Sequence, residues 1–317
     1  MSKPGSVPVA TSARTRTPTR FQDATRAMRT REARAAYMFM LPSLIILSVF
    51  VFWPIVQSVL YSFQDWQFGS STTHWVGFSN YQRMMADYRV SNAFHNTLFY
   101  AAVTVPAGIV LALALALAVN QKLPAVKLFR SAFFLPVLTS FAIMSLVWRF
   151  LLNPDIGLLA YWSQQLGLPT NDWLNDPTWS MWAVIGVSVW KNLGFNMVIF
   201  LAGLQGISEH LYEAATVDGA NAWRRFLHIT LPQLRPTTLF VLVISVIAAF
   251  EVFDVIWVMT PGGGPLFSTD VVVTYIYHEG IELLDVSYAS TIGVVLFVGV
   301  FVLTLIQLRV LRFRDID

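Results

Sequence analysis

Long apolar stretches alternate with short polar connections along the chain. Six stretches are long enough to cross a bilayer, which takes about 20 apolar residues in a helix: residues 37–60, 97–119, 131–152, 180–204, 237–260 and 288–308. We expect each to be a helix, because within lipid every backbone polar group has to be paired inside its own segment. No strand-period alternation indicates a barrel. The pattern predicts an all-α integral membrane protein with six transmembrane helices.

Composition agrees with a membrane protein, since 56% of the 317 residues are hydrophobic and only 12% are charged. Residues 1–36 differ from the rest in being rich in Ser, Thr, Pro and Arg. We expect a basic, partly disordered tail there, followed by a six-span domain at residues 37–317. The first apolar stretch is too long, and its basic flank too extended, for a cleaved signal peptide.

Lysine and arginine are distributed unevenly over the connections. Of the 21, 17 lie in the tail, between residues 119 and 131, in the connection at residues 205–236 or after residue 308. Connections rich in these residues face the cytoplasm, so we expect both termini to be cytoplasmic. The net charge of +3 therefore reflects topology, and no nucleic-acid-binding module accompanies it.

Motifs that carry chemistry are missing from the sequence. None of the four lysines follows a glycine, so there is no phosphate-binding loop of the kind that hydrolyses ATP. There is neither a His-Glu-x-x-His zinc motif nor a Gly-x-Ser-x-Gly nucleophile elbow. We expect a chain that is not an enzyme and holds no metal or cofactor. A stand-alone secondary transporter stays the rival class, although we find no internal repeat of the kind such proteins typically show.

The connection at residues 205–236 has the pattern of a folded element. Ser208 is placed to cap a short helix, and Gly219 permits a turn that residues with a side chain resist. A second short helix follows. The sequence therefore predicts a helix-turn-helix at the membrane surface.

The second of these helices carries an apolar stripe. Trp223, Phe226 and Leu227 fall on one face, and we expect the helix to end at Pro232, which has no backbone N–H to donate. The stripe has two interpretations. It rests on lipid, as interfacial helices commonly do, or it docks into a groove on a cytoplasmic partner.

Fixed positions in this connection resemble the cytoplasmic loop signature of ABC importer permease subunits, E-A-A-x3-G-x9-I-x-L-P. The matching residues are Glu213, Ala214, Ala215, Gly219, Ile229, Leu231 and Pro232. The neighbouring Asp218-Gly219-Ala220 and the run ITLPQLRP resemble the carbohydrate-uptake branch, the relatives of the maltose and glycerol-phosphate permeases. The similarity extends over all six spans and includes the run PGGGP at residues 261–265.

The resemblance implies a type I ABC importer permease-like bundle whose helix-turn-helix couples to a separate ATPase. In that family the loop inserts into a cleft of the ATPase, with Glu213 near a basic group of the partner and Gly219 making the bend. The implied ATPase-subunit-binding residues are Glu213, Ala214, Ala215, Asp218, Gly219, Trp223, Phe226, Ile229, Leu231 and Pro232.

The resemblance also implies partners and a location. The partners are two copies of an ABC ATPase subunit, which bind the ATP and Mg, a second and related permease subunit, and an extracytoplasmic solute-binding protein. The location is a bacterial or archaeal plasma membrane. The implied cargo is a mono- or oligosaccharide, with glycerol-3-phosphate or a glycerophosphodiester as the alternative.

Two spans carry ionisable residues that are costly in lipid. Lys191 lies about 16 Å from the outer end of its span, and Glu251 and Asp254 lie in the outer half of theirs. Such groups normally face a bundle interior or a water-filled cavity. Neighbouring aromatic and amide side chains suit sugar rings, which have an apolar face and a rim of hydroxyls. The predicted pathway residues are Trp190, Lys191, Asn192, Asn196, Phe250, Glu251, Phe253, Asp254 and Trp257.

A structural interpretation of the same residues stays open. Lys191 would form an ion pair with Glu251 or Asp254 while the aromatic rings pack as ordinary core. Arg149, near the outer end of its span, is expected to snorkel to the surface. The PGGGP run is expected to be a bent external loop at the mouth of the cavity, because no strand-loop-helix phosphate site surrounds it.

Overall fold

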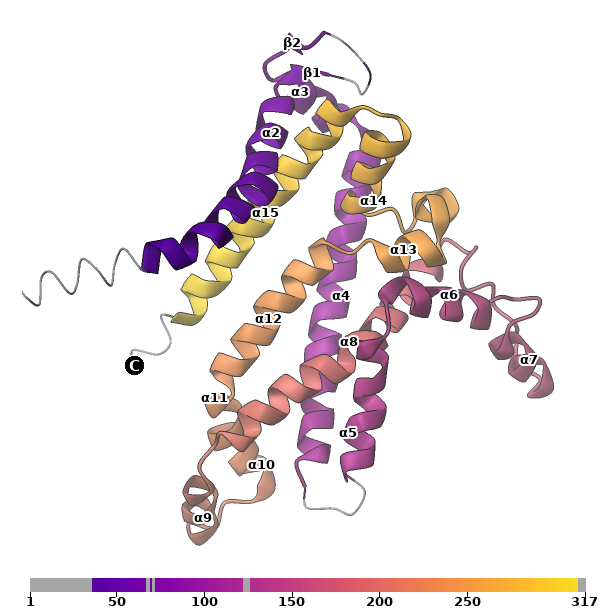
Figure 1. Cartoon of the computed structure of the whole chain (residues 1–317). Coiled ribbons are helices and arrows are strands. Elements are labelled where there is room, and N and C mark those ends of the chain that lie inside the picture. Colours follow the sequence, from indigo (N-terminus) through magenta and orange to yellow (C-terminus); the bar gives the residue numbers. More distant parts are fainter. Residues whose placement is uncertain (1–35, 67–68, 70–71, 122–125, 313–317) are drawn as a thin grey trace, which may run out of the picture. The chain divides into compact units, whose positions relative to one another are not determined.

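The computed structural model describes residues 36–66, 69, 72–121 and 126–312 (Figure 1). The chain divides into two compact units, Met1–Gln57 and Ser58–Asp317. The division falls beyond the expected boundary at residue 36, because the first apolar helix groups with the first unit. Apart from Ala36, the expected tail lies outside the described residues.

The described part of the first unit is helical. The segment Ala36–Tyr61 is a continuous apolar helix that contains the π-helical turn η1 (Ser48–Phe52) and then α2 (Trp53–Tyr61), whose last residues belong to the second unit. Pro54 lies two residues after the end of η1. Proline has no N–H to donate, and a wider turn before it accommodates the missing hydrogen bond.

After the end of α2, the second unit continues with a small hairpin and a short helix. Strands β1 (Gln64–Asp65) and β2 (His74–Trp75) pair antiparallel, and the short helix α3 (Ser79–Ala86) follows them. The carboxylate of Asp87 then caps α4 (Tyr88–Val119) by accepting a hydrogen bond of 2.9 Å from the Arg89 amide. Helix α4 therefore starts nine residues before the apolar stretch that predicted it.

The third expected span is broken. Helix α5 (Val126–Phe134) continues into the 3-10 helix η2 (Leu135–Leu138), and α6 (Phe141–Leu151) follows at an angle of 101°. The prediction of one helix over residues 131–152 is wrong. Pro136 removes a backbone donor at this point, and the two residues after η2 have extended ψ angles. The short helix α7 (Leu158–Gln165) follows α6 along the chain.

Helix α8 and the coupling element form one stretch of chain. Helix α8 (Ser180–Gln205) has 26 residues and no break. We call residues 208–233 the coupling element. It comprises α9 (Glu209–Val217), α10 (Ala222–Arg225), the π-helical turn η3 (Phe226–Thr230) and α11 (Leu231–Gln233).

The fifth expected span is also broken. Helix α12 (Arg235–Phe250) ends before Glu251, and α13 (Asp254–Met259) begins after the non-helical Phe253 (φ −140°, ψ −64°). The prediction of one helix over residues 237–260 is wrong, since Asp254 instead occupies the first turn of a new helix, where a negative charge is favourable. The remaining elements are η4 (Pro261–Gly263), η5 (Pro265–Phe267), α14 (Val272–Tyr277), η6 (His278–Glu282) and α15 (Val286–Arg312).

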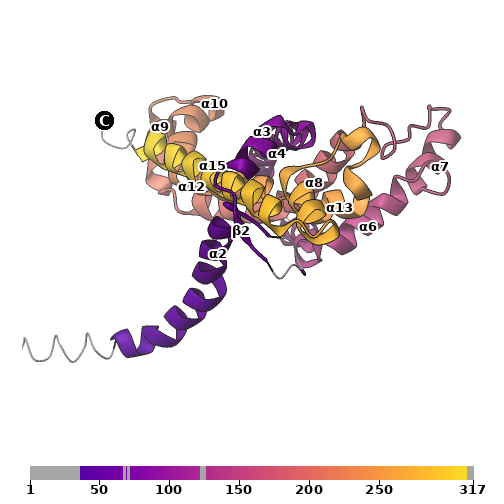
Figure 2. The same ribbon diagram turned by 90° about the horizontal axis from the view of Figure 1, so that it is seen from above.

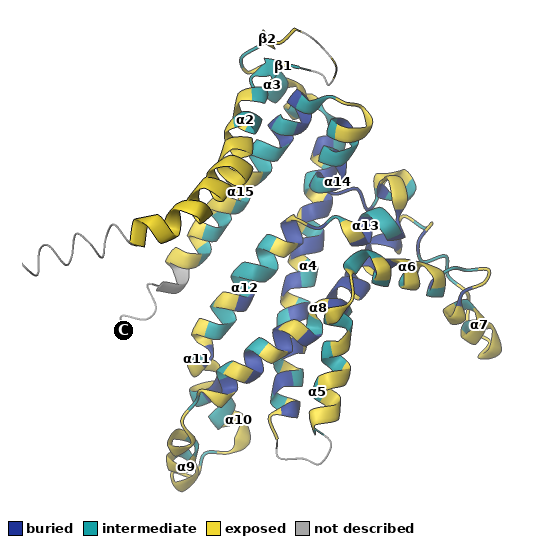
Figure 3. Ribbon diagram, viewed as in Figure 1, coloured by how far each residue is buried: buried dark blue, intermediate teal, exposed yellow. Residues whose placement is uncertain are grey.

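Helices α4, α8 and α12 pack together in the middle of the second unit, where buried residues concentrate (Figures 1 and 3). Small residues permit the close approach, since Ala112 and Ala116 of α4 are fully buried against Met197 and Phe200 of α8. Seen from above, α6 and α7 extend to the side of α8 that faces away from α12 and α15 (Figure 2).

Within the described residues, four helices are long and apolar enough to cross a membrane: Ala36–Tyr61, Tyr88–Val119, Ser180–Gln205 and Val286–Arg309. Two bent pairs raise the number to six, namely Val126–Leu138 with Phe141–Leu151 and Ala222–Gln233 with Arg235–Phe250. The all-α membrane fold is therefore observed, and the described residues supply four unbroken spans, or up to six if each bent pair counts as one.

Candidate functional site

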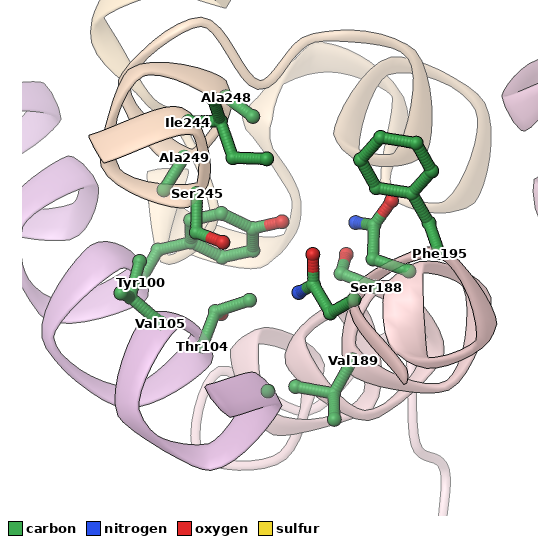
Figure 4. A pocket seen from close by; sticks show the side chains of 13 residues that line it. Tyr100, Thr104, Val105, Ser188, Val189, Phe195, Ile244, Ser245, Ala248 and Ala249 are labelled. Atoms are coloured by element: carbon green, nitrogen blue, oxygen red, sulfur yellow. The ribbon is translucent and has the colours of Figure 1, made fainter. Parts of the chain in front are cut away.

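A cavity of about 240 Å³ lies between α4, α8 and α12 (Figure 4). Val105, Val189 and Ala249, which belong to one hydrophobic cluster of the core, form part of its apolar wall. Polar side chains reach it from all three helices. These are Tyr100 and Thr104 of α4, Ser188, Asn192 and Asn196 of α8, and Ser245 of α12.

Sequence reasoning found two of these polar residues. Asn192 and Asn196 are four residues apart and lie on the same face of α8, as predicted for pathway residues. The hydroxyl-bearing residues were missed, because a lone hydroxyl in a span usually bonds to its own helix. Ser188 shows this, since its Oγ donates to the Val184 carbonyl at 2.8 Å.

A smaller cavity of about 130 Å³ shares Tyr100 and Asn192 with the first. Its other walls come from Phe141 and from the break between α12 and α13, where Glu251, Phe253 and Asp254 line it. Glu251 and Asp254 are exposed and form no ion pair within the part of the chain that the structure describes. Both carboxylates are therefore available to water, to a solute or to a partner.

Lys191 does neither of the things considered for it. Its side chain is buried, and Nζ donates to the carbonyls of Pro136 at 3.0 Å and Thr139 at 2.9 Å, with Nζ 5.0 Å from the centre of the Phe141 ring. These carbonyls lie at the break between η2 and α6, where the Pro136 carbonyl also accepts the Thr139 amide at 3.4 Å and the Thr139 hydroxyl at 2.7 Å. Lys191 lines neither of the two cavities described above and pairs with neither Glu251 nor Asp254, because the broken helix supplies its acceptors.

Gly194 lies one turn beyond Lys191 and faces the same break. A Cβ at this position would lie 2.0 Å from the Phe133 carbonyl oxygen, so only glycine lets α8 approach the end of α5 this closely. We call Lys191 and Gly194 with the backbone of residues 133–139 the clasp. It holds the bend of the third span against α8.

Three other predicted pathway residues serve packing. Trp190 makes an edge contact with Trp148 at 5.4 Å between ring centres, and Phe250 is buried in the hydrophobic cluster. Trp257 stacks on Phe253 at 5.6 Å and touches Tyr277 at 4.7 Å. Of the aromatic residues predicted for the pathway, the structure therefore brings Phe253 to the cavity wall.

The coupling element is folded and exposed. Gly219 has a φ of +75° and open space around it, so the turn between α9 and α10 uses the left-handed backbone that glycine adopts freely. The Glu213 side chain is 70% exposed. Trp223 is exposed too and stacks on Phe226 at 5.6 Å. The element, whose helices α9 and α10 lie at one end of the molecule (Figure 1), thus exposes a carboxylate and an aromatic ring.

Two local predictions about this element are corrected. Ser208 occupies the residue before α9, but its side chain makes no capping hydrogen bond, whereas Asn221 caps α10 by accepting from the Arg224 amide at 2.9 Å. Pro232 does not end the second helix, which runs to Gln233. The π-helical turn η3 directly before α11 widens the hydrogen-bond ladder and accommodates the proline.

Far from the coupling element along α4 and α8, a polar network ties the start of α4 to the PGGGP loop. Arg89 pairs with Asp270 at 3.1 Å, and the Asn96 amide donates to the carbonyls of Phe267 and Asp270 at 3.0 and 2.9 Å. Burial raises the pKa of Asp270 despite hydrogen bonds from Thr274 and Arg89. The loop is therefore held in one place.

The glycines explain the shape of that loop. Gly262, Gly263 and Gly264 all have positive φ, and a Cβ on Gly263 would lie 2.6 Å from the Asp270 Cβ. A cavity of about 290 Å³ separates the loop from Arg149 and Asn153. Arg149 is exposed and donates to the Val258 carbonyl at 3.3 Å.

Asp87 anchors the same region. It accepts hydrogen bonds from the hydroxyls of Tyr275 at 2.8 Å and Tyr288 at 2.7 Å. Burial acts to raise the pKa of this carboxyl, but the hydrogen bonds outweigh it and hold the pKa below its usual range. The first residues of α14 and α15 are thereby fixed to the N-terminus of α4.

Comparisons with known proteins match this architecture. Residues 84–314 match the family model described as "Binding-protein-dependent transport system inner membrane component". The sn-glycerol-3-phosphate transport system permease protein UgpA of Yersinia pestis is 35% identical over 274 residues, which cover 86% of this chain and 92% of the relative. The probable ABC transporter permease protein YurN of Bacillus subtilis is 33% identical over 277 residues, covering 86% and 94%.

Solved structures agree with the sequence matches. A bacterial ABC transporter involved in the import of the acidic polysaccharide alginate has a chain with a TM-score of 0.81 and 26% identity, covering 92% of this chain and 99% of that one. A chain of the alginate transporter in complex with a periplasmic protein bound to an alginate pentasaccharide gives a TM-score of 0.78 and 27% identity, covering 88% and 94%.

The family match, the relatives and the solved structures identify this all-α membrane bundle as the transport subunit of an importer, not an enzyme. The chain belongs to the family of inner membrane components of binding-protein-dependent transport systems, the permease subunits of ABC importers.

Proposed function

We propose that this chain is the permease subunit through which an ATP-driven importer takes up a carbohydrate delivered by an extracytoplasmic solute-binding protein. The observation that carries the proposal is the cavity of about 240 Å³, whose walls combine hydroxyl and amide groups with apolar side chains. Such walls match a sugar, which has hydroxyls at its rim and apolar C–H groups on its faces.

The coupling element supplies the drive in this proposal. Two copies of an ABC ATPase would each grip such an element, so a second permease subunit, related to this one, completes the complex. Helix α8 runs without a break from the cavity to the start of the coupling element, separated from it by Gly206 and Ile207. Movement of the gripped element would then reach the cavity as a rigid-body shift.

The alternative cargo is glycerol-3-phosphate or a glycerophosphodiester, and the named transport of one relative favours it. The charges at the cavities favour a neutral sugar. Glu251 and Asp254 line the smaller cavity, while the nearest buried cation, Lys191, is bonded to backbone carbonyls. An anion entering this space would meet two carboxylates without a free ammonium group.

Charge reversal in the coupling element tests the drive. Glu213→Lys is expected to leave membrane insertion intact and to abolish uptake by loosening the ATPase, and Gly219→Pro is expected to do the same because proline cannot adopt positive φ. Glu209→Lys, on the same helix and exposed but outside the motif, is the matched control. Co-purification of the ATPase and solute uptake are measured together. Wild-type transport by Glu213→Lys would contradict the docking role.

Uptake of radiolabelled solutes by cells that express the complete importer tests the cargo. Neutral mono- and oligosaccharides are expected to be carried, and Asn192→Ala or Phe253→Ala is expected to reduce their uptake while the ATPase stays attached. Uptake of glycerol-3-phosphate alone would establish the alternative. Transport by this chain in vesicles without any ATPase would establish a secondary transporter instead.

The orientation is part of the proposal. Both termini and the coupling element are placed in the cytoplasm of a bacterial or archaeal plasma membrane, because the basic connections gather there. The chain has no cysteine, so single cysteines introduced at Glu209 and Asp155 can be labelled without background. An impermeant maleimide applied to intact cells should label the residue-155 position and spare the residue-209 position.

A further inference from the structure

A groove of about 310 Å³ lies where the coupling element meets α12. Leu227 and Leu231 form one part of its wall, and Leu239 and Leu242 form another. Between them lie Pro232 and Arg235, at the 64° bend between the coupling element and α12. The groove is therefore a mostly apolar surface whose lining also includes Arg235 and Thr238.

Arg235 has an exposed side chain that is free for a ligand. It forms no ion pair and no hydrogen bond in the part of the chain that the structure describes. Arg225, the last residue of α10, differs because its guanidinium donates to the Thr216 hydroxyl at 3.2 Å. A guanidinium binds phosphate through parallel N–H groups.

The position of Arg235 at the start of α12 indicates how deep in the membrane the groove lies. Arg235 is the first residue of the 16-residue apolar helix α12, and a basic residue at the end of an apolar helix is typical of the level of the lipid headgroups. The leucines on α12 follow at the next turns and lie deeper. Water does not fill such a groove favourably, because each water molecule needs two to four polar partners.

We propose that this groove binds one anionic phospholipid, with the phosphate on Arg235 and an acyl chain along the leucines of η3 and α12. The charge of Arg235 and the apolar walls match the two parts of such a lipid. Leu231 and Pro232 line the groove and also belong to the loop signature. The bound lipid would therefore brace the coupling element against α12. This site is independent of which solute the importer carries.

Native mass spectrometry of the full chain with its co-purified partners tests the proposal. After purification from cells that contain phosphatidylglycerol and phosphatidylethanolamine, the wild type is expected to retain one phosphatidylglycerol. Arg235→Gln should bind it about fivefold more weakly, which corresponds to about 1 kcal/mol for one arginine near a lipid headgroup. Arg309→Gln removes the same charge from an exposed position on α15, outside the groove, and should retain the lipid.

Three results would overturn the proposal. Arg235→Gln retaining phosphatidylglycerol as well as the wild type would show that the arginine does not bind it. Equal retention of phosphatidylethanolamine by the wild type would show that the groove does not select anionic lipid. Loss of a partner protein from Arg235→Gln with its phosphatidylglycerol unchanged would make the groove a protein interface. If Arg235→Gln does not accumulate, titration of the wild type with dioleoyl phosphatidylglycerol and dioleoyl phosphatidylcholine decides, since equal affinities contradict selection.

Discussion

The Gly194 contact in the clasp leads to a quantitative prediction for Gly194→Ala. A Cβ there would lie 2.0 Å from the Phe133 carbonyl oxygen, whereas ordinary contacts begin at 3.4 Å. The two segments would have to separate by about 1.4 Å, the difference between these distances. The obstacle is backbone, which cannot turn aside as a flexible side chain can. Overpacking of this kind costs about 1–3 kcal/mol.

Gly186→Ala is the matched control. Gly186 lies on the same helix, and a Cβ on it would meet nothing within 4 Å. Both substitutions gain the same helix propensity, about 1 kcal/mol, from replacing glycine with alanine. The difference between the two variants therefore isolates the contact. We expect Gly194→Ala to be less stable than Gly186→Ala by about 2 kcal/mol.

Thermal unfolding of the purified subunit in detergent measures this difference. A loss of 2 kcal/mol lowers the Tm by roughly 4–8 °C in domains of 150–250 residues. The separation would also stretch the hydrogen bonds of Lys191 to Pro136 and Thr139, which are 3.0 and 2.9 Å long. Uptake should fall with stability. Equal Tm and equal uptake for the two variants would refute the idea that close backbone contact holds the bend.

Three further predictions concern other contacts. Lys191→Met should lower the free energy of unfolding by about 2 kcal/mol. It removes two charge-assisted hydrogen bonds, and no longer burying an ammonium group offsets that loss only in part. A Tm equal to that of the wild type would show that the carbonyls find other partners. Asp87→Asn should lower the Tm at neutral pH and make the Tm fall less steeply below a pH of about 4. A carboxylate whose pKa is lowered by folding stabilises the protein above its unfolded pKa, and that contribution is lost as the pH falls. Parallel profiles of Tm against pH for the variant and the wild type would contradict this. Gly203→Ala should weaken the packing of α8 on α12, because a Cβ would lie 2.5 Å from Thr237 Oγ1; unchanged uptake and unchanged Tm would count against it.

The sequence was sufficient to predict an all-α membrane fold, because the length of an apolar stretch reports what a bilayer requires. It was not sufficient for the two breaks. The break at Thr139 is stabilised by Lys191, which lies 52 residues further along the chain. A pattern read over one helical stretch contains no information about such a distant partner. The lysine was conspicuous in the sequence, but its acceptors were backbone atoms that every residue has.

The candidate site was predicted in part for a related reason. Amides at Asn192 and Asn196 stand out in an apolar span and share a helix face, so spacing identified them. Tyr100, Thr104 and Ser245 come from other spans, and only the packing of three helices brings them to one cavity. The resemblance of the coupling element to a known signature identified the class of protein, which neither hydropathy nor charge could do.

Helix α8 is unbroken and carries two kinds of residue, those that pack against neighbouring helices and those that line the cavity. Evolution can constrain the first kind and vary the second. At 1.5 Å per residue the 26 residues of α8 extend about 39 Å, and a tilt of about 5° at one end displaces the other by about 3 Å over that length. Gly194 and Gly203 of α8 have to stay small, because their close contacts let the helix move as a rigid body together with its neighbours. Asn192 and Phe195 line the cavity instead. Substitutions at these two positions can therefore change substrate specificity while the coupling to the ATPase is kept.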